Sequence, residues 1–107
     1  MAQAIYHADD LPAGGVAAYA AFARDHLEAV EDAIAGLGAA GGGLVIVLGR
    51  AGDDEDDWRR TLARDLARAH APVRVNVIAA DQGAARDSLL DYLNNANAVT
   101  GHYLKGS

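Results

Sequence analysis

The sequence has no cysteine among its 107 residues, and it has few of the large side chains that usually anchor a core. Without thiols the chain can form no disulfide, no thiolate metal site and no cysteine nucleophile. Aromatic residues make up 6% of the chain, with a single tryptophan and a single phenylalanine. The core must therefore be packed closely from thin side chains, many of them alanine.

Positive charge is also scarce. Nine lysines and arginines stand against fifteen aspartates and glutamates, which gives a formal net charge of −6. Phosphate backbones and anionic lipids are bound by clustered Lys and Arg, so neither nucleic acid nor membrane is expected as a partner. No apolar run reaches membrane-spanning length, and the first ten residues lack the basic start and apolar stretch of a signal peptide. We therefore expect a cytoplasmic protein.

The length and composition that remain are those of one folded unit. Residues 1–107 leave no room for a second core, and 51% of them are apolar, which argues against general disorder. We expect a single domain.

The first half of the chain predicts strand, helix and strand. Residues 4–7 are β-prone, and a long helix is expected from about Gly15 to the glycines at 41–43. Its apolar stripe has a spacing of three and four residues, which is typical of a helix with one buried face. That stripe consists of Ala23, Leu27, Val30, Ile34 and Leu37. The continuous apolar run Leu44–Leu48 then predicts a strand that is covered on both faces.

The second half predicts the same alternation. The acidic residues 53–57 open a helix with the stripe Trp58, Leu62, Leu66 and Ala69. A strand follows at 73–80, a third helix near 88–95 and a short last strand at 99–104. The order βαβαβαβ predicts an α/β fold with a four-stranded parallel sheet in sequential order. Right-handed crossovers would place successive helices on the same face.

Three stretches, taken in order, resemble the C-terminal half of the short-chain dehydrogenase/reductase family. They are the glycine-led strand 42–48, the helix and strand 62–79 containing Arg74-Val75-Asn76, and Val99-Thr100-Gly101 with Leu104. The resemblance implies a minimal Rossmann-like domain. It carries over only Asn76, Thr100 and Gly101, which are mainly structural in the family.

The catalytic residues of that family do not carry over. Its serine would fall at or beside Gly49 and Arg50, and its Tyr-x-x-x-Lys pair is replaced by the acidic residues 52–57. The family's Pro-Gly after the next strand has become Ala80-Asp81, and its glycine-rich phosphate loop does not occur in this sequence. The resemblance therefore implies neither dehydrogenase activity nor a nucleotide cofactor, and we expect no cofactor.

A ligand would be expected at the C-terminal ends of the strands. The charged residues predicted at this rim are Asp10, Arg50, Asp53 and Asp81. Converging carboxylates could hold Mg²⁺ or Ca²⁺, but helix capping and a solvated surface explain the acidic run better, so no catalytic, cofactor or metal site is assigned. A receiver-like Mg²⁺ domain would need a lysine at a strand end, and the single lysine, Lys105, is predicted to lie beyond the last strand.

Two functional hypotheses follow. The favoured one is a non-catalytic protein that acts by self-association, or as an accessory subunit of a related enzyme. The expected partner is a second copy or a related subunit, because three helices on one face would leave the other sheet face exposed. The alternative is a small enzyme or a binder of a small molecule or divalent cation at the rim. A concave rim would favour this alternative, and a flat rim would favour association.

Overall fold

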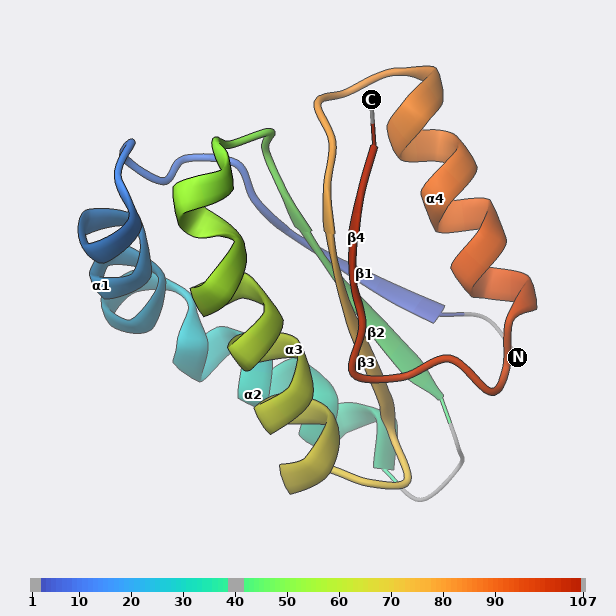
Figure 1. The fold of residues 1–107 in the computed structure, drawn as a ribbon. Helices are drawn as coiled ribbons and strands as arrows, with labels where there is room; N and C mark the ends of the chain where they lie inside the picture. The colour runs from blue at the N-terminus through green and yellow to red at the C-terminus, as the bar shows by residue number, and fades with distance from the viewer. Residues whose placement is uncertain (1–2, 39–41, 107) are drawn as a thin grey trace.

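The structure, a computed structural model, describes residues 3–38 and 42–106. Four strands form one parallel sheet in the order β1-β2-β3-β4, which confirms the predicted α/β architecture (Figure 1). Every residue of the second strand is buried, because helices cover both of its faces. The strands are β1 (Gln3–Ala8), β2 (Gly43–Leu48), β3 (Arg74–Ala79) and β4 (Tyr103–Lys105).

The predicted last strand is too long. Residues 99–104 were expected to be extended, but only Tyr103–Lys105 pair with β3. Before Tyr103 the chain contacts β3 through single hydrogen bonds of Thr100 and Gly101, and it turns at Gly101. The Thr100 hydroxyl accepts a hydrogen bond from the Val75 N–H at 3.0 Å, and Gly101 adopts a φ of 75°, which glycine tolerates without strain. The ladder can begin only after this turn.

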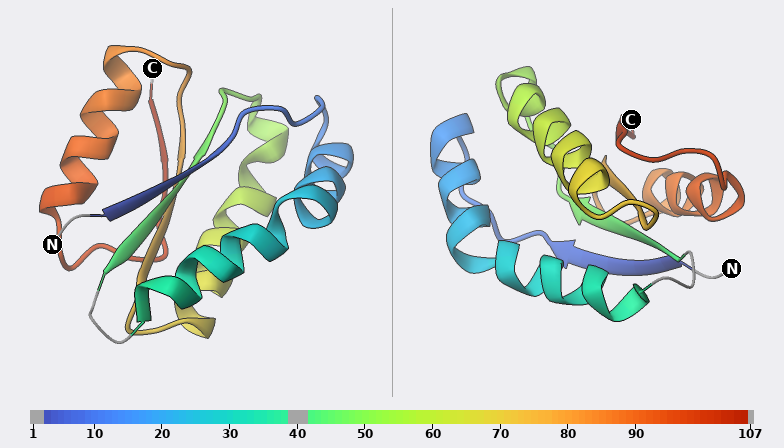
Figure 2. Two further views of the ribbon diagram at one scale, coloured as in Figure 1. Left: turned by 180° about the vertical axis from the view of Figure 1, so that it is seen from behind. Right: turned by 90° about the horizontal axis from the view of Figure 1, so that it is seen from below.

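The sheet lies between two layers of helix (Figures 1 and 2). On one face lie α1 (Gly15–Asp25), α2 (Leu27–Leu37), the short 3₁₀ helix η2 (Asp53–Glu55) and α3 (Asp56–Ala69); on the other lies α4 (Ala84–Asn95). No helix among the described residues is long and apolar enough to cross a bilayer.

The predicted long first helix is broken in two at His26. Its ring accepts or donates at both nitrogens: Nδ1 lies 2.9 Å from the Tyr6 hydroxyl and Nε2 lies 2.8 Å from the Asp10 carboxylate. The expected stripe is wrong before this break, because Ala23 is exposed and Phe22 is buried in its place. The break rotates the face that α1 turns to the core relative to that of α2.

The end of that helix also differs from the expectation. The second segment stops at Leu37, and Gly38 follows it with a φ of 59°. The glycine predicted to end the helix at position 41 lies outside the described residues, whereas Gly42 and Gly43 are buried and lead into β2. The left-handed conformation of Gly38 therefore ends the helix earlier than the glycine cluster.

The fourth helix corrects the prediction that all helices share one face. It begins at Ala84, four residues earlier than expected, and packs on the face opposite α1, α2 and α3. Since the strand order is sequential, the β3–α4–β4 connection has the opposite hand to the two connections before it. The reason is apolar burial. This face carries Val45, Val47 and Ile78, and they pack against Leu89, Leu90 and Leu93.

Candidate site at the strand ends

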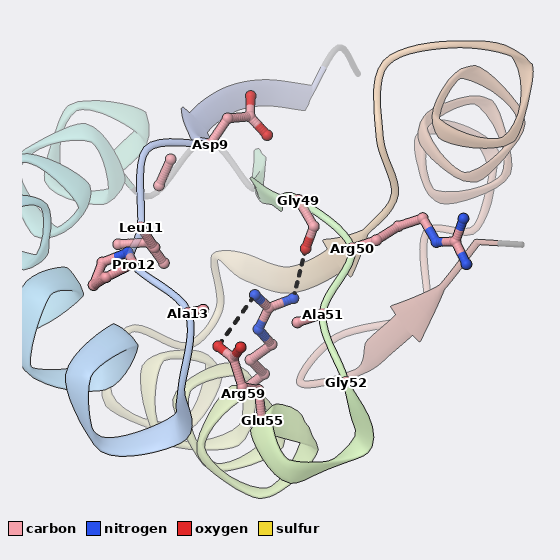
Figure 3. A pocket seen from close by; sticks show the side chains of 11 residues that line it. Asp9, Leu11, Pro12, Ala13, Gly49, Arg50, Ala51, Gly52, Glu55 and Arg59 are labelled. Carbon is pink, nitrogen blue, oxygen red and sulfur yellow. Dashed lines mark hydrogen bonds and ion pairs between the residues drawn. The ribbon is translucent and has the colours of Figure 1, made fainter.

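The C-terminal strand ends enclose a cleft of about 250 Å³ (Figure 3). One wall is the loop after β1, the other is the loop after β2, and the start of α3 forms the floor. The rim is therefore concave rather than flat. The lining residues are Ala8, Asp9, Leu11, Pro12, Ala13, Gly49, Arg50, Ala51, Gly52, Glu55 and Arg59.

The floor of the cleft is a buried ion pair. Arg59 is 3% exposed and Glu55 is 6% exposed, and their Nη2 and Oε1 atoms lie 3.6 Å apart. Arg59 Nη1 also donates to the Gly49 carbonyl at 2.9 Å, whereas its Nε is buried without a hydrogen-bond partner. Buried charges are stable only when paired, so Glu55 compensates the charge of Arg59, while the hydrogen bond to Gly49 holds the loop after β2 against α3.

A second buried arginine, Arg86, links helix α4 to the C-terminal ends of two strands. Arg86, near the start of α4, donates from Nη2 to Asp9 Oδ1 at 2.7 Å and from Nε to the Ala80 carbonyl at 2.9 Å. Its side chain is 9% exposed. Because Asp9 follows β1 and Ala80 follows β3, this arginine ties α4 to two strand ends at once.

The four rim residues predicted from the sequence do not converge on one point. Asp10 contacts His26 and does not line the cleft. Asp81 accepts a hydrogen bond from the backbone N–H of Arg50 at 3.1 Å, and in Figure 3 the Arg50 side chain points away from the floor of the cleft. The structure thus brings Arg50 and Asp81 together and separates Asp10 from them.

The remaining rim residue, Asp53, pairs with lysine. Lys105 lies within β4, not beyond it as predicted, and its Nζ is 3.0 Å from Asp53 and 3.1 Å from Asp56. The hydrogen bond to Asp53, and to a smaller extent the one to Asp56, raises the pKa of the Lys105 ammonium above its ordinary value. Arg50, Asp53 and Lys105 line a second hollow of about 220 Å³ beside the cleft.

The polar groups of the rim are thus largely engaged with one another. Within residues 3–38 and 42–106, no group of three or more acidic or histidine side chains is arranged to hold a metal ion. The sequence did contain a signal for the floor, since Glu55 and Arg59 stand at the helical i,i+4 spacing. Arg86 gave no such signal, because its partner Asp9 is 77 positions away in the chain.

The three residues carried over from the family resemblance bind the chain between α4 and β4. Asn76 is 2% exposed; its Nδ2 donates to the Val99 carbonyl at 3.0 Å and its Oδ1 accepts from the His102 N–H at 3.1 Å. The Thr100 hydroxyl accepts from the Val75 N–H, and the Gly101 N–H donates to the Val75 carbonyl at 2.7 Å. These residues lie away from the cleft and hold the sheet edge together.

A sequential parallel sheet, helices on both faces and a cleft at the strand ends define a small Rossmann-like α/β domain. Residues 6–106 match the family described as short chain dehydrogenase-like protein, SDR-like. The chain belongs to this family, which confirms the resemblance found in its sequence. No curated protein and no solved structure matches the chain.

Proposed function

We propose that this chain is a non-catalytic member of the SDR-like family that acts through contact with another protein. The partner is a second copy, or a related subunit for which this chain is an accessory. The observation that carries the proposal is the internal pairing of the rim. Arg59 is bound to Glu55 and Gly49, and Asp53 is bound to Lys105, so these groups serve the fold.

The residues that stand in place of the family's catalytic side chains support the same proposal. Hydride transfer in the family that the sequence resembles relies on a serine, a tyrosine and a lysine, and the corresponding stretches here hold glycine, arginine and aspartate. The acidic residues at the start of α3 oppose a pyrophosphate at that helix end.

Two measurements test this proposal together. Calorimetric titration with oxidised and reduced nicotinamide dinucleotides should give no heat of binding, and sedimentation equilibrium at low micromolar concentration should give a mass above that of one chain. Micromolar binding of any dinucleotide would contradict the non-catalytic half. A monomer that also fails to bind a co-expressed family enzyme would contradict the association half.

The concave rim favours a second candidate, a binder of a small molecule. The cleft of about 250 Å³ has room for a small molecule, and Arg59 in its lining is a cationic side chain that suits an acceptor such as a carboxylate. A rise of the melting temperature with small carboxylates would support this candidate. The rise should disappear in Ala13→Trp, which fills the cleft from an exposed position and leaves Arg59 in place.

A further inference from the structure

The outer edge of the sheet at β1 is open. The strand is six residues long and pairs only with β2 among the described residues. Figure 2 (left) shows it at the near edge of the sheet, with α2 and α4 to its two sides and no helix over it. An open edge strand presents a row of unpaired N–H and C=O groups to any strand that can approach.

The register shows which groups are unpaired. In a parallel sheet, successive residues direct their backbone groups to opposite neighbouring strands. The Arg74 N–H donates to the Gly42 carbonyl and the Ala80 N–H to the Leu48 carbonyl, so the even-numbered residues of β2 bond to β3. Its odd-numbered residues bond to β1. Since Val45 is opposite Ile5, the even-numbered residues of β1 face β2.

The outward backbone groups therefore belong to Gln3, Ile5 and His7. Their side chains lie on the α4 face of the sheet, because Ile5 is opposite Val45, which packs under α4. This helix does not cover the edge completely, and Ile5 remains 45% exposed. Free backbone groups and an uncovered apolar side chain thus coincide at the middle of the strand.

The two edges of the sheet differ in how they are protected. The opposite edge, β4, is three residues long and carries Lys105, and short strands with a lysine resist pairing with another chain. By contrast, no residue of β1 is acidic or carries a lysine or arginine. The acids that follow it are engaged within the chain, Asp9 with Arg86 and Asp10 with His26.

We propose that two copies of this chain pair through β1 in an antiparallel manner, with a two-fold axis at Ile5. The proposal rests on the association proposed above and names its surface. The axis stands perpendicular to the sheet, so each residue meets one on the same face: Ile5 meets Ile5, and Gln3 meets His7. Four strands from each copy then form one continuous sheet.

A second copy fits this edge for reasons of charge and symmetry. The chain has a net charge of −6, so association of two copies is opposed least where the contact itself adds no acidic side chain, and β1 is such a surface. A two-fold axis at Ile5 also satisfies every outward N–H and C=O of Gln3, Ile5 and His7 with the same groups of the partner. Isologous contacts of this kind are the commonest in homo-oligomers.

Cross-linking tests the register directly, because the chain has no cysteine of its own. In the proposed pair the two Ile5 Cα atoms lie about 5.5 Å apart, within the range that a disulfide spans. The Ile5→Cys variant should form a disulfide-linked dimer under mild oxidation at low micromolar concentration. The Val16→Cys variant is the control, since Val16 is 86% exposed on α1 and far from the axis, and it should stay largely uncross-linked. Equal cross-linking of the two variants would overturn the proposal.

The Ile5→Pro variant separates this proposal from association in general. Its missing N–H points away from β2, so the internal ladder keeps all its hydrogen bonds while the proposed pair loses its central ones. Sedimentation should show the wild-type chain as a dimer and Ile5→Pro as a monomer with unchanged helical circular dichroism. A dimer that persists in Ile5→Pro would overturn pairing through β1 and leave association intact. A wild-type monomer would overturn both pairing through β1 and self-association.

Discussion

At the scale of single residues, Asn76 joins β3 to the segment that leads into β4 through two side-chain hydrogen bonds. Its amide satisfies the Val99 carbonyl and the His102 N–H, one on each side of the turn at Gly101. Both groups of the side chain are buried, so water cannot replace them. Asn76 therefore fixes the position of the segment 99–102, which leads into β4.

Replacing Asn76 with alanine should lower the free energy of unfolding by about 1–3 kcal/mol, since it removes two partly buried hydrogen bonds, to the Val99 carbonyl and from the His102 N–H. Urea denaturation followed by circular dichroism measures this. The matched control is Asn94→Ala, because Asn94 is exposed on α4 and should change stability by no more than about 0.5 kcal/mol. Equal losses in the two variants would show that the amide hydrogen bonds contribute little.

Lys105 gives a pH-dependent prediction. Its pKa is raised above the ordinary lysine value by hydrogen bonds to Asp53 and Asp56. A raised pKa in the folded state means that the pairing stabilises the fold below the unfolded-state pKa and is lost as the pH rises through the folded-state pKa. The weakening therefore belongs to the alkaline range. Asp53→Asn should move the Lys105 pKa back toward its ordinary value.

This shift can be followed by NMR, because the chain has only one lysine. Asp57→Asn is the control, since Asp57 is fully exposed and pairs with Arg60 rather than with Lys105. If both substitutions shift the Lys105 pKa equally, the effect is one of net charge and not of the contact with Asp53.

At this scale the sequence was a partial guide to the site. It identified Arg50, Asp53 and Asp81 at the strand ends, because parallel strands end at the same edge of the sheet. It did not reveal that Asp10 turns to His26, since a loop's direction depends on contacts between distant residues. The pair of Asp9 and Arg86 was missed for the same reason.

At the scale of elements, the acidic start of the third helical segment has two explanations with different consequences. Asp53 and Asp54 lie in η2, directly before α3, where negative charge complements the helix dipole. A metal site at the same position would need further ligands. The two explanations differ in how the protein responds to divalent cations.

The Asp53→Asn, Asp54→Asn double variant should lose at most about 1–2 kcal/mol of stability, the size of a surface dipole and capping effect. The melting temperature of the wild-type chain should not change with added Mg²⁺ or Ca²⁺. A large rise in the wild type that is absent from the double variant would instead indicate a cation site.

The elements themselves were well predicted where the apolar pattern is regular, either one face of a helix or a continuous apolar strand. The strands β2 and β3 and the helix α3 match their expected positions within a few residues. Errors occur where a local signal competes with a distant contact. In the sequence, the apolar stripe through 23–37 keeps its helical spacing across His26. In the structure the helix is broken at His26, whose ring contacts Tyr6 and Asp10. The face chosen by α4 depends on apolar area on β2 and β3, which periodicity within the helix cannot reveal.

At the scale of the whole molecule, the covering of the second face by α4 removes one reason for expecting association. An exposed sheet face was predicted, and Leu93 and its neighbours bury it instead. Association itself stays a prediction, and its support now comes from the open β1 edge. That edge is a smaller apolar surface, so backbone hydrogen bonds must contribute a larger share of the binding.

The net charge decides how such a dimer should respond to salt. Each copy carries −6, and the proposed contact contains no ion pair between copies, so long-range electrostatics oppose association. Salt shortens the range of this repulsion, from about 30 Å at 0.01 M to about 8 Å at 0.15 M. Dimerisation through β1 should therefore strengthen as salt is added, by roughly tenfold in Kd between low and physiological ionic strength. Sedimentation equilibrium across a salt series measures this change. The opposite trend, a dimer that salt dissociates, would point to ion pairs across the interface and therefore to a different surface.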